Sequence, residues 1–411
     1  MSERVAVQRY RWVILLLSSL GFTMSWIFRS SYSPLIEEIK ASLGLSYSEA
    51  GLLMSLFWIG YNLTQIPSGI ISDKIGVRVT YSLALLIAGL FNFLRGSAAS
   101  FLELALYTFI NGLACGFSWA PGSLIIIRWF KLKERSMALG IFTSSAPIGI
   151  VTALFSAPLI STIFGSWRWS FWILSLPTFI VSTLMFIFLK DNPPTTRYKE
   201  NDDEGNIPVT EILLTIVKSK NFWLFTIVMI GLTTITSGAM TWVPSYYINI
   251  FSLSPVVAGS LVAISSAVSI FSGPSAGFLA THLLKRKTPI MFLSVFATSI
   301  LYLLLSLRVD FNLTLNLILI VIANYFGNMG FGINVSILAD WFPLSIVGTA
   351  VGFLNFTGGM GSVIGPWLFG EVLEVTGSYA YSWATLALIA LAASSLMIPI
   401  MRKEKSAIEE I

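Results

Sequence analysis

A single basic side chain, Arg29, stands within a long apolar stretch near the amino terminus, since residues 12–35 contain no other charged residue. Moving an arginine to the centre of a bilayer costs about 2.5 to 3.5 kcal/mol on insertion scales, so such a residue normally faces a cavity, a partner or an anionic ligand. No acidic partner is visible deep in any apolar stretch. The sequence therefore predicts that Arg29 binds an anion.

The position of Arg29 leaves a second interpretation open. It follows Arg11 by 18 residues, which is about 27 Å along a helix at ~1.5 Å per residue. A tilted helix would place the guanidinium in a central cavity, whereas another placement would let the side chain extend to the outer interface.

The composition places the chain in a membrane. Charged residues make up 11% of its 411 residues and hydrophobic residues 55%, whereas a soluble domain carries about 25% charged residues. Apolar stretches of about 20 residues, each long enough to cross a ~30 Å hydrocarbon core, recur along the chain. Because lipid accommodates only helices or closed barrels, we expect an all-α membrane protein.

Twelve such stretches lie between charged or Pro- and Gly-rich breaks. The first is expected to be retained, because no small-residue cleavage pattern follows it. The predicted spans are 11–35, 48–71, 77–97, 101–128, 136–162, 168–189, 221–248, 255–281, 287–307, 313–339, 344–372 and 379–400.

The Lys and Arg counts of alternate loops predict the orientation. When the basic residues near the span ends are counted with the adjoining loops, the loops on the side of the amino terminus hold 20 such residues, and the opposite loops hold four, which are Lys40, Arg95, Arg168 and Arg308. We therefore expect a multi-pass protein of the plasma membrane with both termini in the cytoplasm.

The longest hydrophilic segment, residues 191–220, predicts a cytoplasmic linker between two six-helix bundles, 1–190 and 221–411. The two halves carry an internal repeat. Trp129, Phe130, Ala138, Gly140, Gly149 and Gly165 recur as Trp341, Phe342, Ala350, Gly352, Gly361 and Gly377, at a constant offset of 212. The glycine-rich stretch 357–365 is expected to permit close helix approach.

The turn at residues 69–78 combines glycine and charge between two apolar stretches. Asp73 follows Gly69 by four residues, Gly76 comes three further on, and Arg78 closes the turn. This spacing resembles the loop between the second and third helices of the major facilitator superfamily. The resemblance implies twelve transmembrane helices in two pseudo-symmetric six-helix bundles, with a substrate site near the midplane between them.

In that family the acid and the base of this loop latch the cytoplasmic face against the neighbouring half. Thr281 and Leu284 replace Asp73 and Gly76 in the second repeat, so only the first copy keeps the signature. The predicted gating residues are Gly69, Asp73, Gly76 and Arg78, with Arg128, Glu134 and Arg135 from the loop after the fourth span. Plain topology-setting or solvated loop charge is the alternative.

A closer resemblance runs through nearly the whole chain. Arg29 with Tyr32 and residues 57–67, 128–135 and 242–246 are similar to the anion:cation symporter branch, which carries organic anions such as sugar acids and other carboxylates. The resemblance implies that Arg29 is the substrate-binding arginine of the first helix. It likewise implies pocket roles for Tyr61 and Asn355.

The chain departs from that branch at the positions of its usual proton-binding carboxylates, where it has Phe28 and Cys115. The coupling ion, whether proton or sodium, is therefore left open. The remaining acids and the histidine near span ends are expected to be structural, namely Glu103, Asp340, Glu371 and His282.

Further candidates rest on position alone. Asn324 and Asn328 share a helix face, which suits either substrate contact or hydrogen bonding between helices. Trp119 and Trp242 would either line a cavity or pack in the core. The complete set of predicted substrate-binding residues is Arg29, Tyr32, Tyr61, Gln65, Trp119, Trp242, Tyr246, Asn324, Asn328 and Asn355.

These features predict a secondary active transporter, expected as a monomer, that moves a small organic anion by alternating access. A facilitator or exchanger of a neutral or amphipathic solute is an alternative, with Arg29 extending to the interface. A non-transporting membrane sensor would show a sizeable soluble domain, and none is visible. The chain has no phosphate-binding lysine loop and no Cys/His cluster, so no enzyme activity, metal, cofactor or nucleic-acid partner is expected.

Overall fold

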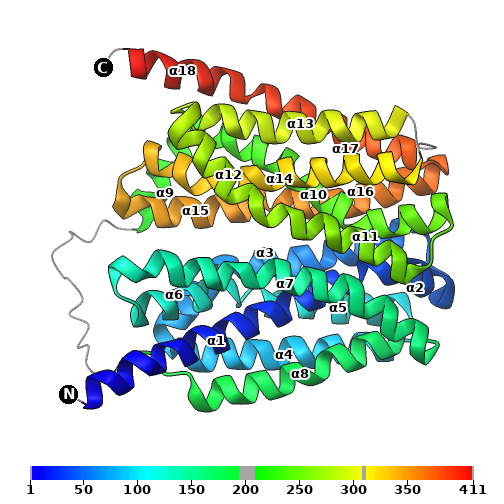
Figure 1. Ribbon diagram of the computed structural model, residues 1–411, viewed down its shortest axis with the longest axis horizontal. Coiled ribbons are helices and arrows are strands. Elements are labelled where there is room, and N and C mark those ends of the chain that lie inside the picture. Colours follow the sequence, from blue (N-terminus) through cyan, green and yellow to red (C-terminus); the bar gives the residue numbers. More distant parts are fainter. Residues whose placement is uncertain (1, 194–208, 308–311, 410–411) are drawn as a thin grey trace. The chain divides into compact units, whose positions relative to one another are not determined.

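The structure, a computed structural model, describes residues 2–193, 209–307 and 312–409. These residues form helices and no strands (Figure 1). Eleven segments among them are long and apolar enough to cross a membrane, and each matches a predicted span. The remaining predicted span, 48–71, lies in a further long helix, α3 (Tyr47–Ile75). The all-α membrane fold is thus confirmed.

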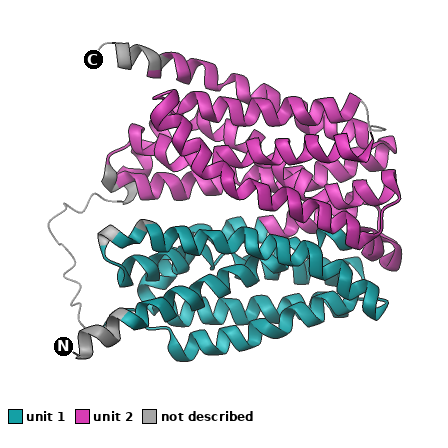
Figure 2. Ribbon diagram, viewed as in Figure 1, with its two compact units in different colours: residues 1–35, 59–207 teal, residues 36–58, 208–411 magenta. Residues whose placement is uncertain are grey.

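The chain divides into two compact units (Figure 2). Unit 1 contains residues 1–35 and 59–207, and unit 2 contains residues 36–58 and 208–411. Helix α3 contributes its first part to unit 2 and the rest to unit 1. The bundle boundaries at 190 and 221 stay a prediction. Residues 194–208 of the predicted linker lie outside the described residues, and the linker's end forms helix α9 (Val209–Lys218).

In unit 1, α1 packs against α7, and α4 packs against α5 and α8. The elements that lie wholly in this unit are α1 (Ser2–Ser30), η1 (Ser33–Leu35), α4 (Val77–Ser97), α5 (Phe101–Cys115), α6 (Trp119–Trp129), α7 (Leu132–Phe164) and α8 (Trp167–Phe188).

In unit 2, α10 packs against α16 and α17, and α13 packs against α14 and α17. Besides α9, its elements are α2 (Ile36–Leu43), α10 (Lys220–Phe251), α11 (Pro255–Val268), η2 (Ser269–Phe271), α12 (Ser272–Phe278), η3 (Leu279–Leu283), α13 (Thr288–Leu307), α14 (Leu313–Trp341), α15 (Leu344–Gly358), α16 (Met360–Thr376), α17 (Tyr379–Ser395) and α18 (Met397–Glu409).

Several membrane-spanning segments are interrupted rather than continuous. The first, Arg9–Leu43, stops being α-helical after Ser30 and resumes at Ile36. The segment Phe101–Trp129 breaks between α5 and α6, and Ile346–Thr376 breaks at Gly359 between α15 and α16. Irregular backbone at membrane depth is tolerated only where protein or a water-filled cavity surrounds it.

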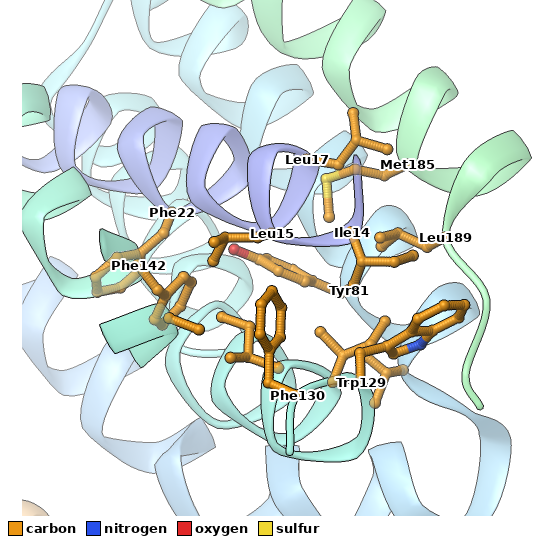
Figure 3. Close-up of a cluster of buried hydrophobic side chains, with 14 of the residues drawn as sticks. Ile14, Leu15, Leu17, Phe22, Tyr81, Trp129, Phe130, Phe142, Met185 and Leu189 are labelled. Atoms are coloured by element: carbon orange, nitrogen blue, oxygen red, sulfur yellow. The ribbon is translucent and has the colours of Figure 1, made fainter. Parts of the chain in front are cut away.

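The apolar core of unit 1 gathers around α1. Phe22 of α1 stacks on Phe142 of α7 with ring centroids 4.7 Å apart, and Figure 3 shows both beside the ring of Tyr81. Tyr81 donates its hydroxyl hydrogen to the Ser18 carbonyl at 2.9 Å, which ties α4 to α1. This core fixes the helix that carries Arg29.

Glycines let α10 and α16 approach closely in unit 2. A Cβ atom at Gly361 would collide with the Ile230 carbonyl, and one at Gly365 with the Thr234 carbonyl. The Thr233 hydroxyl also donates to the Gly358 carbonyl at 2.6 Å. The expected close helix approach at residues 357–365 is therefore present.

Candidate functional site

Arg29 lies in the last turn of α1, inside a candidate membrane segment that runs from Arg9 to Leu43. The predicted span, 11–35, lies within this segment, which α2 continues to Leu43. Whether the Arg29 side chain faces a cavity or extends to the interface stays a prediction.

The guanidinium of Arg29 lies over the indole ring of Trp26, with its central carbon 3.8 Å from the ring centroid. Both side chains are partly exposed. The Tyr61 hydroxyl of α3 and the Cys115 thiol at the end of α5 lie within electrostatic range of the guanidinium. Tyr61 is hydrogen-bonded to Gln65, one turn further along α3. Unit 1 therefore brings Arg29, Tyr61 and Gln65 together.

The break between α5 and α6 packs against the same turn of α3. A Cβ atom at Gly116 would lie 2.6 Å from the Tyr61 carbonyl oxygen. On the α1 side, the hydroxyls of Ser118 and Ser25 are hydrogen-bonded at 3.2 Å. Three elements thus converge on the Arg29 region, namely the end of α1, the middle of α3 and the α5–α6 break.

Trp119 opens α6 within an aromatic group of unit 1. Its ring lies 5.6 Å from Phe22 and 5.8 Å from Phe142, and Phe22 also contacts Trp26 at 6.0 Å. Trp119 therefore packs behind Trp26, and substrate contact by Trp119 stays a prediction.

A second arginine, Arg95, contacts the end of α1. The prediction of orientation counted this residue as a loop charge. Arg95, in the last turn of α4, is 1% exposed. Its Nη1 atom donates to the Phe28 carbonyl at 3.1 Å and to Asn92 Oδ1 at 3.2 Å. Its guanidinium also faces the ring of the buried Tyr32, at 5.7 Å. Tyr32 therefore packs on Arg95, and a substrate contact by Tyr32 stays a prediction.

The sequence did carry a signal for Arg95. The predicted span 77–97 includes it, and Asn92 stands one turn earlier on the same helix face. Treating Arg95 as a loop charge was wrong, because its guanidinium is buried between α1 and α8. Without Arg95, the loops on the side of the amino terminus still hold more Lys and Arg residues than the opposite loops.

Two predicted contacts in unit 2 are fully buried. Trp242 donates its indole hydrogen to the Pro366 carbonyl at 2.9 Å and stacks on Phe369. Tyr246 accepts a hydrogen bond from Asn316 Nδ2 at 2.6 Å. In this structure both side chains serve packing, which is the interpretation left open for Trp242.

The asparagines of unit 2 lie on partly exposed faces. Asn324 donates to Ser265 Oγ of α11 at 2.9 Å, and Asn328 donates to the Asn324 carbonyl at 2.8 Å. Asn324 therefore links two helices. Asn355 lies in the last turn of α15, where its carbonyl accepts from Gly359 at the helix break.

The predicted gating residues form contacts within unit 1. Arg128 donates to Asp73 Oδ1 at 2.9 Å, joining α6 to α3. Glu134 accepts two hydrogen bonds from Arg11, at 2.5 and 3.2 Å, which joins α7 to α1. Arg135 donates to the Phe130 carbonyl at 3.0 Å. Their role in gating stays a prediction.

The turn after α3 depends on Asp191. Gly76 has a φ of 97° and would bring a Cβ atom to 2.8 Å from Asp191 Oδ2. Asp191 Oδ1 accepts the Arg78 backbone N–H at 2.9 Å, and Arg78 Nε donates to the Phe186 carbonyl at 2.6 Å. A Cβ atom at Gly69 would meet nothing within 4 Å. The turn therefore ties α4 to α8, and sequence reasoning missed Asp191.

The acids near span ends have local partners. Glu103 accepts from the Ala99 N–H at the start of α5 at 2.8 Å. Asp340 accepts from Lys287 Nζ at 2.6 Å, and Glu371 accepts from the Ser48 hydroxyl. His282 lies 5.0 Å from the Phe278 ring. These contacts agree with structural roles.

Residues 18–334 match the family model of the Major Facilitator Superfamily. Together with the all-helical fold, this match shows that the chain belongs to that superfamily, whose members are transporters rather than enzymes.

Particular relatives narrow the comparison. The chain is 24% identical to the hexuronate transporter of Bacillus subtilis strain 168, over 95% of this chain and 94% of that protein. It is 28% identical to a probable galactarate/D-glucarate transporter of Escherichia coli K12, over 94% and 92%. The fold matches that of a bacterial homolog of the human lysosomal transporter Spinster, with a TM-score of 0.83 at 18% identity over 96% and 97%.

Proposed function

We propose that this protein is a secondary active transporter of small organic anions of the sugar-acid class, working by alternating access. The observation that carries the proposal is the position of Arg29. It lies in the last turn of α1, inside an interrupted candidate membrane segment, partly exposed, and close to Tyr61. We place the protein in the plasma membrane with both termini in the cytoplasm, from the loop-charge asymmetry.

The chemistry of the Arg29 region suits a hydroxylated carboxylate. A guanidinium presents paired N–H donors that match the two oxygens of a carboxylate. The phenol of Tyr61 and the amide of Gln65 offer hydrogen bonds to sugar hydroxyls. Interrupted helices near the midplane commonly form substrate sites in secondary transporters, and α1 breaks directly after Arg29.

The relatives support the same substrate class. Those compared above are named for hexuronate and for galactarate and glucarate, and a further relative at 23% identity is a D-galactonate transporter of Escherichia coli. All of these substrates are carboxylates with several hydroxyl groups. A carboxylate is therefore the substrate class to test first.

Counterflow in proteoliposomes tests this proposal. The panel contains labelled D-galactonate, galactarate and D-glucuronate, with D-galactose as the neutral counterpart, each with and without a pH gradient. We expect exchange of at least one acid and none of galactose. A stimulation by an inward proton gradient would assign proton coupling.

Three arginine variants separate the anion site from its alternative. Arg29→Gln should abolish exchange of the best acid, and Arg29→Lys should retain part of it because the charge remains. Arg168→Gln, on an arginine that contacts α4 carbonyls, is the control for loss of an arginine elsewhere in unit 1. If the wild type exchanged galactose, and Arg29→Gln exchanged it at the same rate, a facilitator of neutral solutes would be favoured instead.

A further inference from the structure

We infer that Arg95 is a positioning residue for the anion site, holding the broken end of α1 so that Arg29 faces the substrate. The inference deepens the proposed function and rests on it for the identity of the ligand. It concerns a residue on α4 that hydrogen-bonds the backbone of α1. Its first support is the contact between Arg95 and the backbone next to Arg29.

The end of a helix inside a membrane has carbonyl groups without helical partners, and leaving them unsatisfied in hydrocarbon is costly. Helix α1 ends at Ser30, inside a candidate membrane segment that continues to Leu43. The carbonyl of Phe28, the residue before Arg29, accepts from Arg95 Nη1 at 3.1 Å and from the Ser31 hydroxyl at 3.2 Å. Arg95 therefore supplies a hydrogen bond that allows α1 to stop at this point.

The Arg95 side chain is itself held by contacts with Asn92 and with α8. Asn92 accepts from Arg95 through Oδ1, and its Nδ2 donates to Ser175 Oγ at 2.9 Å and to the Phe171 carbonyl at 3.2 Å. The Phe171 ring lies 4.4 Å from the Arg95 guanidinium carbon. All of these side chains are buried. A chain of contacts therefore runs from α8 through α4 to the backbone of Phe28.

The charge of Arg95 adds to that of Arg29. None of the ion pairs between described residues involves Arg95, and its recorded hydrogen-bond acceptors are neutral oxygens. Arg95 donates to the carbonyl of Phe28, the residue before Arg29, which places the Arg95 charge beside the end of α1 that carries Arg29. In a buried environment such a charge is weakly screened, so Arg95 should raise the attraction of the site for anions.

Substrate affinity gives the first test. Arg95→Gln should raise the KM of the best sugar acid about tenfold or more, the scale of a lost charge-assisted hydrogen bond. Vmax should change less than KM, and Arg95→Lys should recover part of the affinity. In an Arg29→Lys background, which keeps part of the exchange, Arg95→Gln should raise KM less than it does in the wild type, because it acts largely through Arg29. An equal loss in both backgrounds would overturn the inference.

A thiol-labelling test does not need a substrate. Cys115 is the only cysteine, so Arg29→Cys in a Cys115→Ala background carries one thiol at the site. We compare its labelling by an anionic and a cationic methanethiosulfonate reagent of similar size. Adding Arg95→Gln should lower the anionic-to-cationic rate ratio at least threefold, whereas adding Arg168→Gln should leave it unchanged. Equal ratios with and without Arg95 would overturn the inference.

The two tests separate this inference from the proposed function. If no sugar acid is exchanged, the proposed function fails, while the labelling ratio still decides whether the Arg95 charge acts at the Arg29 position. If Arg95→Gln does not fold, Asn92→Ala replaces it, because it removes the support of Arg95 and keeps the charge. Asn92→Ala should raise KM at least threefold, and an unchanged KM would count against the positioning role.

Discussion

The central carbon of the Arg29 guanidinium lies 3.8 Å from the centroid of the Trp26 indole ring, and the two residues lie one turn apart on α1. This contact restricts the Arg29 side chain before a ligand arrives. A binding group that is already ordered loses less conformational entropy on binding. The pair is therefore a small preorganised unit at the proposed site.

Replacing Trp26 should weaken anion binding without removing the charge. Cation–π contacts of this kind contribute about 0.5 to 2 kcal/mol, so Trp26→Leu should raise KM by about 2- to 30-fold. Trp26→Phe keeps an aromatic face, so its KM should lie between those of Trp26→Leu and the wild type. KM measured by counterflow gives the ranking, and a Leu variant with wild-type KM would show that the stacking does not contribute to binding.

Asp73→Asn should slow transport with little effect on stability. The Asp73 side chain is 62% exposed in its ion pair with Arg128, and exposed pairs contribute about 1 kcal/mol or less. We expect an unchanged melting temperature and a severalfold lower Vmax, because the predicted role is gating. A normal Vmax would reduce the pair to a topology-setting loop charge.

Gly76→Ala should destabilise the protein. Alanine at a φ of 97° and a ψ of 145°, a backbone region essentially confined to glycine, carries a penalty of about 1 to 3 kcal/mol, and its Cβ would press on Asp191. Gly69→Ala is the matched control, because its Cβ would lie in open space and alanine favours a helix by up to about 1 kcal/mol over glycine. In detergent, the melting temperature of Gly69→Ala should be higher than that of Gly76→Ala. The reverse order would contradict this account of the turn.

Tyr246→Phe distinguishes packing from substrate contact. Tyr246 and Asn316 are fully buried, and the phenol oxygen accepts the Asn316 amide hydrogen. Its removal should cost about 1 to 3 kcal/mol, because the amide loses its acceptor. Adding Asn316→Leu should recover part of the stability. A raised KM with normal stability would point instead to substrate contact.

Much of the fold could be predicted from the sequence, because membrane helices depend on local composition. Every predicted span lies in a long helix or an interrupted helical segment. The apolar pattern of the first span does not show that the α-helix is interrupted between Ser30 and Ile36. A helix break depends on what satisfies the freed carbonyls, and that partner, Arg95, is distant in the sequence.

The candidate site was predictable only in part. Arg29 could be singled out because a charge in an apolar stretch is costly wherever it lies, and the family resemblance pointed to Tyr61. Whether Trp242 packs or faces a cavity depends on Pro366 and Phe369, more than a hundred residues away. No local pattern reports such a contact.

The sequence by itself determined that this chain forms membrane-spanning helices with one arginine within the apolar stretch of the first, because hydrophobicity and charge act locally on partition into lipid. Only the tertiary structure decided how that arginine is held. The packing of α4 against α8 buries Arg95 beside the end of α1, and burial turns an apparent loop charge into the group that supports Arg29.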